Sequence, residues 1–332
     1  MGEILINRKS RFQYMDIMKG ILILLVVYGH TAWQAHEVGI HNQTIEILGQ
    51  TGFLYEPFYM AAFFAITGYC SNFKKSYKDF LISDIKTLLF PSVSLCVVAA
   101  FIRYLIMGEI DLSWITPHRL LRFCSLHWFL PALFWAKQIH FFLHRFNQYV
   151  VSIIYIFLTF VGFYLVGHTT EYWWFYHALM FVIYLQFGSL IKSIPIPSKS
   201  IYVILYLVVV IALLTITGNV PKVTSETNMQ GWQMPIFILT SCIGTLGMFW
   251  ISQKIHTCKF LEYLGRNSIV IYCVHFTLMN DFYRLFADSI DTMNVYQSVF
   301  TLILMYSMIL TICTCVCWML NFKYTRWIVG KF

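Results

Sequence analysis

The chain has 332 residues, of which 59% are hydrophobic, 18% aromatic and only 11% charged. Soluble domains carry about 25% charged residues, so this composition excludes a soluble enzyme, and it also excludes a disordered chain and a small disulfide scaffold. The formal net charge of +8 is not gathered in one basic patch, which argues against a nucleic-acid partner. The sequence therefore predicts an all-α integral membrane protein in contact with lipid.

Apolar runs separated by short polar clusters predict a bundle of about ten transmembrane helices. They form one multi-pass domain over residues 1–332, with no soluble domain. A basic run precedes the first span and no small-residue cleavage site follows it, so we expect this span to be retained. The expected spans, in chain order, are 15–35, 53–73, 80–107, 122–142, 149–167, 173–191, 201–217, 234–252, 268–287 and 295–320.

The distribution of Lys and Arg between the loops predicts the orientation. With the N-terminus in the cytoplasm, the inside segments hold fifteen of these residues, and the outside segments hold only Arg119, Arg122, Lys222 and Arg284. Cytoplasmic loops are enriched in Lys and Arg, and an odd number of spans would break this bias in the second half of the chain. We therefore expect both termini to be cytoplasmic.

The first span carries three ionisable residues: Asp16, Lys19 and His30. At 100° per residue, Lys19 and His30 lie within about 20° of one helix face and about 16 Å apart along the axis, and Asp16 lies within about 60° of both. Ile23, Val26 and Val27 fall between them on that face. The pattern predicts an apolar slot with charge at its cytoplasmic end and an imidazole in its outer half.

These residues allow a structural and a functional interpretation. Asp16 and Lys19 could form an ion pair at the helix start, with Lys19 reaching toward the interface. His30 could be a hydrogen-bonded residue within the bundle. Imidazole is nevertheless the side chain best suited to take and return a proton near neutral pH, and ionisable groups within spans are costly, so His30 is also a candidate catalytic base.

Two further residues have similar alternatives. His275 is expected at a depth close to that of His30, where it could bond a carbonyl or tyrosine across helices or contribute to the site. Lys86 could join Lys19 in a basic entrance for a polyphosphate, or serve with nearby lysines as an orientation signal. No histidine spacing suggests a metal site, so none is expected.

Many aromatic residues, Trp128 among them, are expected near the outer face. Such residues commonly form an interfacial belt, although some could stack against sugar rings.

Four segments, in order along the chain, resemble motifs of the acyltransferase 3 family of multi-pass membrane proteins. They are MDIMKGILILLVVYGH (15–30), FFAITGYCSNF (63–73, with Thr67 at the usual serine), HWFLPALF (127–134) and LGRNSIVIYCVH (264–275). Members move an acyl group, usually acetyl from acetyl-CoA, to a hydroxyl of an extracytoplasmic glycan or its lipid-linked precursor. The resemblance thus implies a bacterial cytoplasmic membrane enzyme.

Carried onto this chain, the resemblance makes His30 the essential histidine and Lys19 its basic partner, usually arginine. The third span has Lys86 beside Asp84 where relatives often carry arginines. Tyr59 stands where sugar-acetylating members often have histidine.

We therefore interpret the chain as a membrane O-acyltransferase, with acetyl-CoA as donor and a glycan or lipid-linked sugar as acceptor. His30 is the expected base or acyl carrier, and Asp16, Lys19 and Lys86 are the expected donor-binding residues. The expected acceptor-side residues are Tyr59, Trp128, His275 and Glu56, with Glu56 or Glu171 as candidates to orient His30. The alternatives are a carrier or flippase for glycan intermediates, whose charges would line a path, and a structural scaffold.

Overall fold

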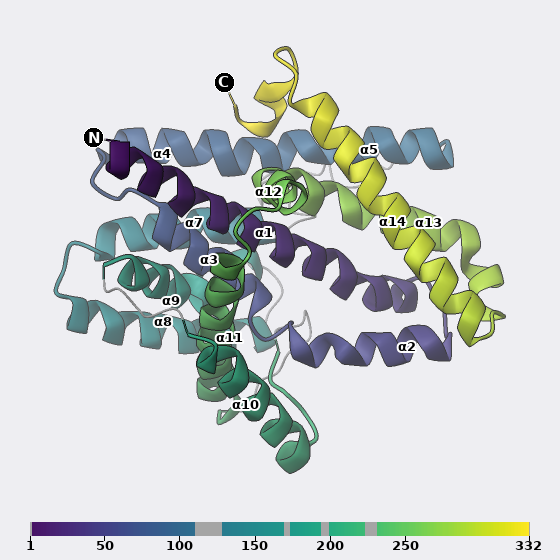
Figure 1. The fold of residues 1–332 in the computed structure, drawn as a ribbon, viewed down its shortest axis with the longest axis horizontal. Coiled ribbons are helices and arrows are strands. Elements are labelled where there is room, and N and C mark those ends of the chain that lie inside the picture. Colours follow the sequence, from purple (N-terminus) through teal and green to yellow (C-terminus); the bar gives the residue numbers. More distant parts are fainter. Residues whose placement is uncertain (1, 110–127, 169–172, 194–198, 223–230, 332) are drawn as a thin grey trace.

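The computed structural model describes all residues except 1, 110–127, 169–172, 194–198, 223–230 and 332 (Figure 1). The described residues form helices and turns and no strand, which confirms the all-α prediction for this part of the chain. The helical elements, in chain order, are α1 (Gly2–Glu37), α2 (Gln43–Gln50), η1 (Thr51–Leu54), α3 (Tyr59–Cys70), α4 (Tyr77–Asp84), η2 (Ile85–Leu89), α5 (Phe90–Met107), α7 (Phe129–Leu143), α8 (Gln148–His168), α9 (Trp173–Ser193), α10 (Ile201–Thr217), α11 (Gln233–Lys254), α12 (Lys259–Arg266), α13 (Ser268–Asp291), α14 (Val295–Leu320) and η3 (Arg326–Val329).

Six stretches of the described chain are long and apolar enough to cross a membrane by length and composition: α1, the continuous α4 to α5 rod, α8, α9, α11 and α14. The apolar helices α3 and α10 are shorter. The helices α7, with 15 residues, and α13, with several charges in its C-terminal half, overlap the expected spans 122–142 and 268–287, of which 122–127 lie outside the described residues. The chain is thus a multi-pass membrane protein, whereas the count of ten spans and the location of the termini remain predictions.

The α4 to α5 rod changes its winding where the sequence places a proline. Residues Ile85–Leu89 form a π-helical turn, and Pro91 follows in the first turn of α5. Proline has no backbone N–H and its ring crowds the carbonyl four residues earlier, so an α-helix must adjust at this point. The rod stays continuous, and Asp84 lies at the last residue before the change.

α1 crosses the centre of the molecule and packs against α12 and α13 (Figure 1). Glycine makes the first contact close, because a Cβ on Gly20 would lie 2.1 Å from the carbonyl oxygen of Leu261, and one on Gly265 would lie 1.8 Å from that of Asp16. Small residues let helix backbones approach in this way inside membranes. The backbones of α1 and α12 are therefore nearly in contact at the start of the first span.

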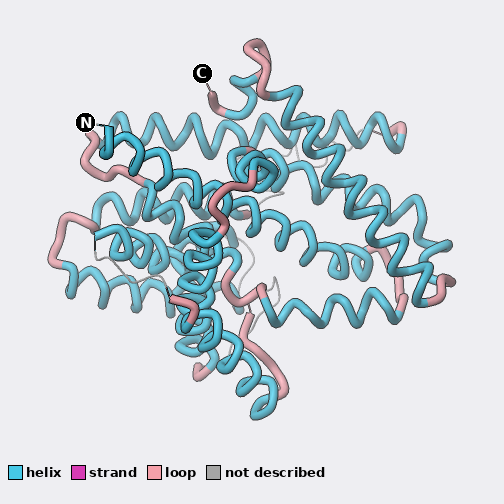
Figure 2. The backbone as a smooth tube through the Cα atoms, viewed as in Figure 1, coloured by secondary structure: helices cyan, strands magenta, loops and turns pink. Residues whose placement is uncertain are grey.

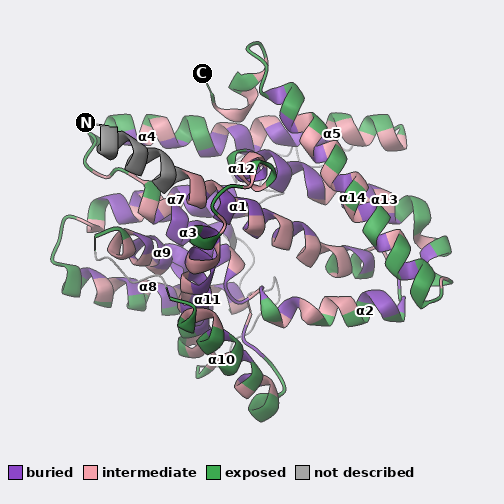
Figure 3. Cartoon of the chain, viewed as in Figure 1, coloured by how far each residue is buried: buried purple, intermediate pink, exposed green. Residues whose placement is uncertain are grey.

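A second group consists of α3, α7, α8 and α9, which pack around α9, and its helix α3 contacts α1. Glycines again set the closest approach, since a Cβ on Gly68 of α3 would lie 2.0 Å from the Leu185 carbonyl oxygen and one on Gly188 of α9 would lie 1.8 Å from that of Ala65. Purple, buried stretches are extensive along α3, α7 and α9 (Figure 3).

The outward faces of the peripheral helices are apolar. Figure 3 shows exposed positions along α10 and α14 at the edge of the molecule. Exposed apolar patches of this extent are unusual on soluble proteins and are the expected surface toward lipid tails. Examples on α8, α10 and α14 are Ile153, Phe157, Val208, Ile211, Phe300 and Ile303.

The connections from α1 to α2 and from α13 to α14 lie together at one end of the molecule, on the right in Figure 2. The backbone N–H of His41 donates to Asp291 Oδ1 at 2.7 Å, and Asn42 Nδ2 donates to the carbonyl of Ile290 at 2.9 Å. These contacts join the connection that follows α1 to the C-terminal end of α13. The two helices therefore run in the same direction side by side.

Candidate active site

His30 of α1 and His275 of α13 lie in direct contact. His275 Nε2 is 3.3 Å from His30 Nδ1, and the two ring centroids are 5.1 Å apart. The two residues are 245 positions apart in the chain. The sequence placed them at a similar depth, and the parallel packing of α1 and α13 brings them together.

The surrounding hydrogen bonds define the tautomers of both rings. His275 Nδ1 lies 2.9 Å from the carbonyl oxygen of Ile271, so this nitrogen carries the proton and Nε2 holds a lone pair when the ring is neutral. His30 Nδ1 then faces two acceptors, His275 Nε2 and the carbonyl oxygen of Val26 at 2.8 Å. His30 must therefore carry its proton on Nδ1, which leaves a lone pair on Nε2.

His30 is the accessible member of this pair. Its side chain is partly exposed, whereas His275 is only 1% exposed. Trp33 lies edge-on to His30 with ring centroids 6.0 Å apart, and Phe276 lies 5.8 Å from it on the other helix. The arrangement presents an imidazole, oriented through Nδ1, beside two aromatic rings.

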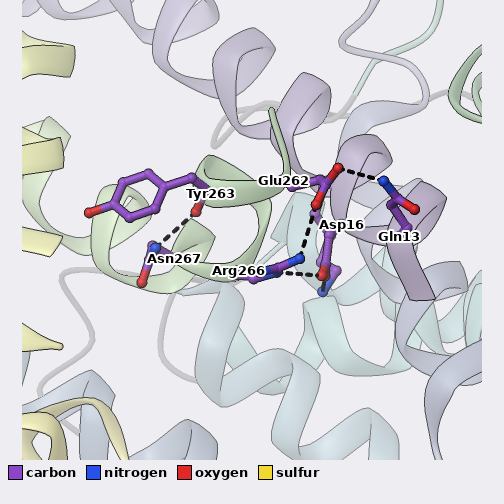
Figure 4. Close-up of polar contacts among 7 residues, drawn as sticks. Gln13, Asp16, Glu262, Tyr263, Arg266 and Asn267 are labelled. Atoms are coloured by element: carbon purple, nitrogen blue, oxygen red, sulfur yellow. Dashed lines mark hydrogen bonds and ion pairs between the residues drawn. The ribbon is translucent and has the colours of Figure 1, made fainter. Parts of the chain in front are cut away.

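The same face of α1 carries an ion-pair cluster about three turns before His30. Lys19 Nζ lies 2.8 Å from Asp16 Oδ1, and Arg266 Nε of α12 lies 3.0 Å from Asp16 Oδ2. Arg266 Nη2 also contacts Glu262 at 3.0 Å, and Gln13 donates to Glu262 at 2.8 Å (Figure 4). Asp16 and Lys19 were expected from the sequence, whereas Arg266 was not.

This cluster could bind phosphate through its hydrogen-bond donors, although it carries no net charge. Two cations and two carboxylates cancel within it. Lys19 nevertheless uses one of its three N–H groups in these contacts and Arg266 uses two of its five, so both retain donors for phosphate oxygens. Asp16 holds both cations in position.

The apolar slot expected between Lys19 and His30 is closed in this structure. Ile23, Val26 and Val27 are each 1% exposed or less and belong to the hydrophobic core. The reason is that α12 and α13 cover this face of α1. The charged cluster and the histidine pair are therefore separated by packed side chains.

The other expected site residues lie on separate elements. Lys86 is exposed within the π-helical turn η2, and Tyr59 begins α3 with its ring 5.9 Å from that of Tyr55. Trp128 precedes α7 and its ring lies 4.5 Å from His177.

Glu56 does not contact His30. It forms an ion pair with Lys222 at 2.6 Å, so the residue that orients His30 Nδ1 is His275 and not Glu56. Glu171, the other candidate for that role, lies outside the described residues.

Two ion pairs between helices were not predicted from the sequence. Asp84, 1% exposed, contacts Lys137 Nζ and accepts from Gln138 Nε2 at 3.0 Å. Asp281 lies 3.7 Å from Arg103 Nε. The available signal was a lone cation within an apolar run, in FWAKQ and in AAFIRYL.

A cavity of about 260 Å³ lies on the opposite side of α1 from His30. Tyr28 and Ala32 line it, and at 100° per residue these positions lie about 160° from His30. Its walls are mostly apolar, so it does not contribute to the histidine site. In the described part of the chain, no three His, Cys, Asp or Glu side chains gather as metal ligands would.

Comparison with known proteins identifies the family. Neither a curated protein nor a solved structure matches the chain. Residues 12–322 match the acyltransferase 3 family, described as an acyltransferase domain. This range includes both histidines and the charged cluster, and it covers nearly the whole chain. The chain therefore belongs to the acyltransferase 3 family, as its four motifs predicted, and is a multi-pass membrane acyltransferase.

Proposed function

We propose that this protein is an O-acyltransferase that moves an acyl group, most simply acetyl, from cytoplasmic acyl-CoA to a hydroxyl of an extracytoplasmic glycan or lipid-linked sugar. It would act in the cytoplasmic membrane of a bacterium. The observation that carries the proposal is the partly exposed His30, whose Nδ1 is held by Val26 and His275 in a chain of this family. Tyr59 and Trp128 remain proposed acceptor-side residues.

In this mechanism His30 Nε2 accepts the proton of the acceptor hydroxyl as its oxygen attacks the thioester carbonyl. The new C–O bond forms, the C–S bond breaks, and the proton passes from His30 to the leaving thiolate, which gives the ester and CoA. While His30 is protonated, the Val26 carbonyl and the lone pair of His275 Nε2 face its Nδ1–H and stabilise the cation.

The donor is proposed to bind with its phosphates at Lys19 and Arg266, together with Lys86. The separation of about 16 Å between Lys19 and His30 suits an extended pantetheine arm. Because Ile23, Val26 and Val27 are packed, the arm needs α12 and α13 to separate locally from α1, or needs to pass beside this face.

The side of the membrane on which acetyl-CoA must be supplied distinguishes the proposed acyltransferase from a carrier. Purified protein in sealed vesicles, with acetyl-CoA confined to the compartment that faces the N-terminus and acceptor supplied on the other side, should acylate the acceptor and release CoA in the first compartment. We expect no product when acetyl-CoA is confined to the acceptor side. Equal activity from that side, or movement of labelled glycan without CoA release, would contradict the proposal, the latter in favour of a carrier.

Charge removal at the inner end should weaken donor binding. The Lys19→Ala, Lys86→Ala double variant is expected to bind acetyl-CoA about 10- to 100-fold less tightly, because each phosphate loses a charge-assisted hydrogen bond. Lys19→Arg should be tolerated, since arginine matches phosphate at least as well. Isothermal titration of the purified protein measures this, with Lys254→Ala, an exposed lysine at the end of α11, as the matched control. Unchanged affinity in the double variant would locate the donor site elsewhere.

A further inference from the structure

A second polar contact joins α1 and α13 one helical turn beyond the histidine pair. Gln34 Nε2 donates to Asn280 Oδ1 at 3.0 Å. Gln34 follows His30 by four residues and Asn280 follows His275 by five, so this contact lies about 6 Å farther toward the outer end of both helices. The function proposed above uses neither residue.

Gln34 is buried, at 4% exposure, and its Oε1 has no hydrogen-bond partner among the described residues. Leaving such an oxygen unpaired away from water costs free energy, and native proteins rarely do so without a reason. Asn280 is partly exposed, and its Nδ2 makes no hydrogen bond to Gln34. The two joined amides therefore present one acceptor group and one donor group.

The two amides offer one acceptor group and one donor group in either orientation. If both were flipped, Asn280 would donate to Gln34, and the pair would still offer one oxygen and one NH₂ group. A vicinal pair of sugar hydroxyls needs the same complement, because one hydroxyl donates while its neighbour accepts.

The neighbouring aromatic residues suit the same ligand. Trp33 is 42% exposed although it lies next to the histidine pair, and its ring centroid is 5.5 Å from that of Phe276. A flat, accessible ring can pack against the C–H face of a sugar, while the amide pair forms hydrogen bonds with the sugar hydroxyls. Both features lie within one turn of His30, on the expected acceptor side.

We infer that Gln34 and Asn280 bind the hydroxyls next to the one that is acylated, with Trp33 supporting the sugar ring. The inference rests on the proposed function, because it gives that reaction a carbohydrate acceptor held by a vicinal diol. A sugar bound there places its reactive hydroxyl toward His30 Nε2, one turn inward.

The test measures steady-state transfer in the vesicles described above, with the glycan and glycolipid extract of the source cells as acceptor, titrated by hexose content. Gln34→Ala and Asn280→Ala should raise the apparent KM for the extract about 3- to 10-fold, the effect of losing a neutral hydrogen bond. The KM for acetyl-CoA should stay within about 2-fold of wild type.

The Asn280→Asp variant distinguishes a role in acceptor binding from a role in packing α1 against α13. Its carboxylate can still accept from Gln34 Nε2 but has lost the outward donor, so the contact between helices remains while the acceptor KM should rise as in Asn280→Ala. The exchanged pair, Gln34→Asn with Asn280→Gln, should restore much of the wild-type KM. Asn42→Ala is the matched control, because it also removes an amide that binds α13, from the connection between α1 and α2, and lies farther from His30.

An unchanged acceptor KM in Gln34→Ala and Asn280→Asp, or the same rise in Asn42→Ala, would overturn the inference while leaving the acyltransferase activity intact. If wild-type protein transferred nothing to the extract, the proposed function itself would fail. The two failures are therefore distinguishable.

Discussion

Replacing His30 with alanine is expected to lower acyl transfer by at least about 100-fold, since a positioned general base contributes 10²- to 10⁴-fold. His30 is the partly exposed imidazole of the histidine pair, and its Nδ1 contacts leave Nε2 for the acceptor hydroxyl. The loss should appear in kcat, measured as CoA release and as ester formed, because the residue acts on the reacting atoms rather than on donor phosphates.

The matched control is His36→Ala, which removes an exposed histidine from the same helix. That variant should retain wild-type transfer, and both variants should elute as folded protein in detergent and bind acetyl-CoA. Transfer by His30→Ala at the wild-type rate would remove the central assignment, whatever the behaviour of the control.

Replacing His275 with alanine should lower kcat by about 10- to 100-fold, the effect of losing a hydrogen bond to a group that becomes charged during the reaction. His275 positions His30 and stabilises its protonated form, so the KM for either substrate should change little. His275→Gln can place an oxygen where Nε2 lies and should recover part of the activity. His275→Asn is too short to do so and serves as the comparison.

The pH dependence of kcat distinguishes this role from simple packing. Two imidazoles in contact titrate as a pair, so removing one should shift the acid limb of the profile in His275→Gln even where the rate at neutral pH is recovered. Equal kcat values for the Gln and Asn variants, with the wild-type profile, would show that His275 only fills space.

Hydrophobicity was sufficient to predict most helices, and two of them to the residue. The expected spans 201–217 and 295–320 coincide with α10 and α14. The expectation at 53–73 was wrong in detail, since only Tyr59–Cys70 is α-helical there, preceded by the short turn Thr51–Leu54. The short helices α2 and α12 were missed because eight residues give little periodic signal.

The site was predictable only along one helix. The period of α1 correctly placed Asp16, Lys19 and His30 on one face, because helix geometry relates neighbouring residues. The partners of that face come from α12 and α13, about 250 residues later, and no local pattern specifies which helices will meet. Arg266 and Asn280 were therefore missed, and His275 was expected at the depth of His30 but not as its direct partner. The same limit hid the partners of Arg103 and Lys137.

The sequence distance between the partners on α1 and α13 delays their first contact during biosynthesis. His30 leaves the ribosome 245 residues before His275, a delay of about 10 to 50 s at ordinary rates of translation. Throughout that interval the polar groups of α1, among them Asp16 and Gln34, lie in a membrane without the residues they will contact. The nascent chain must shelter them with water, lipid headgroups or an insertion partner. Because Arg266, His275 and Asn280 arrive on one continuous segment, the charged cluster, the histidine pair and the amide pair are completed together, and a chain interrupted before this segment completes none of them.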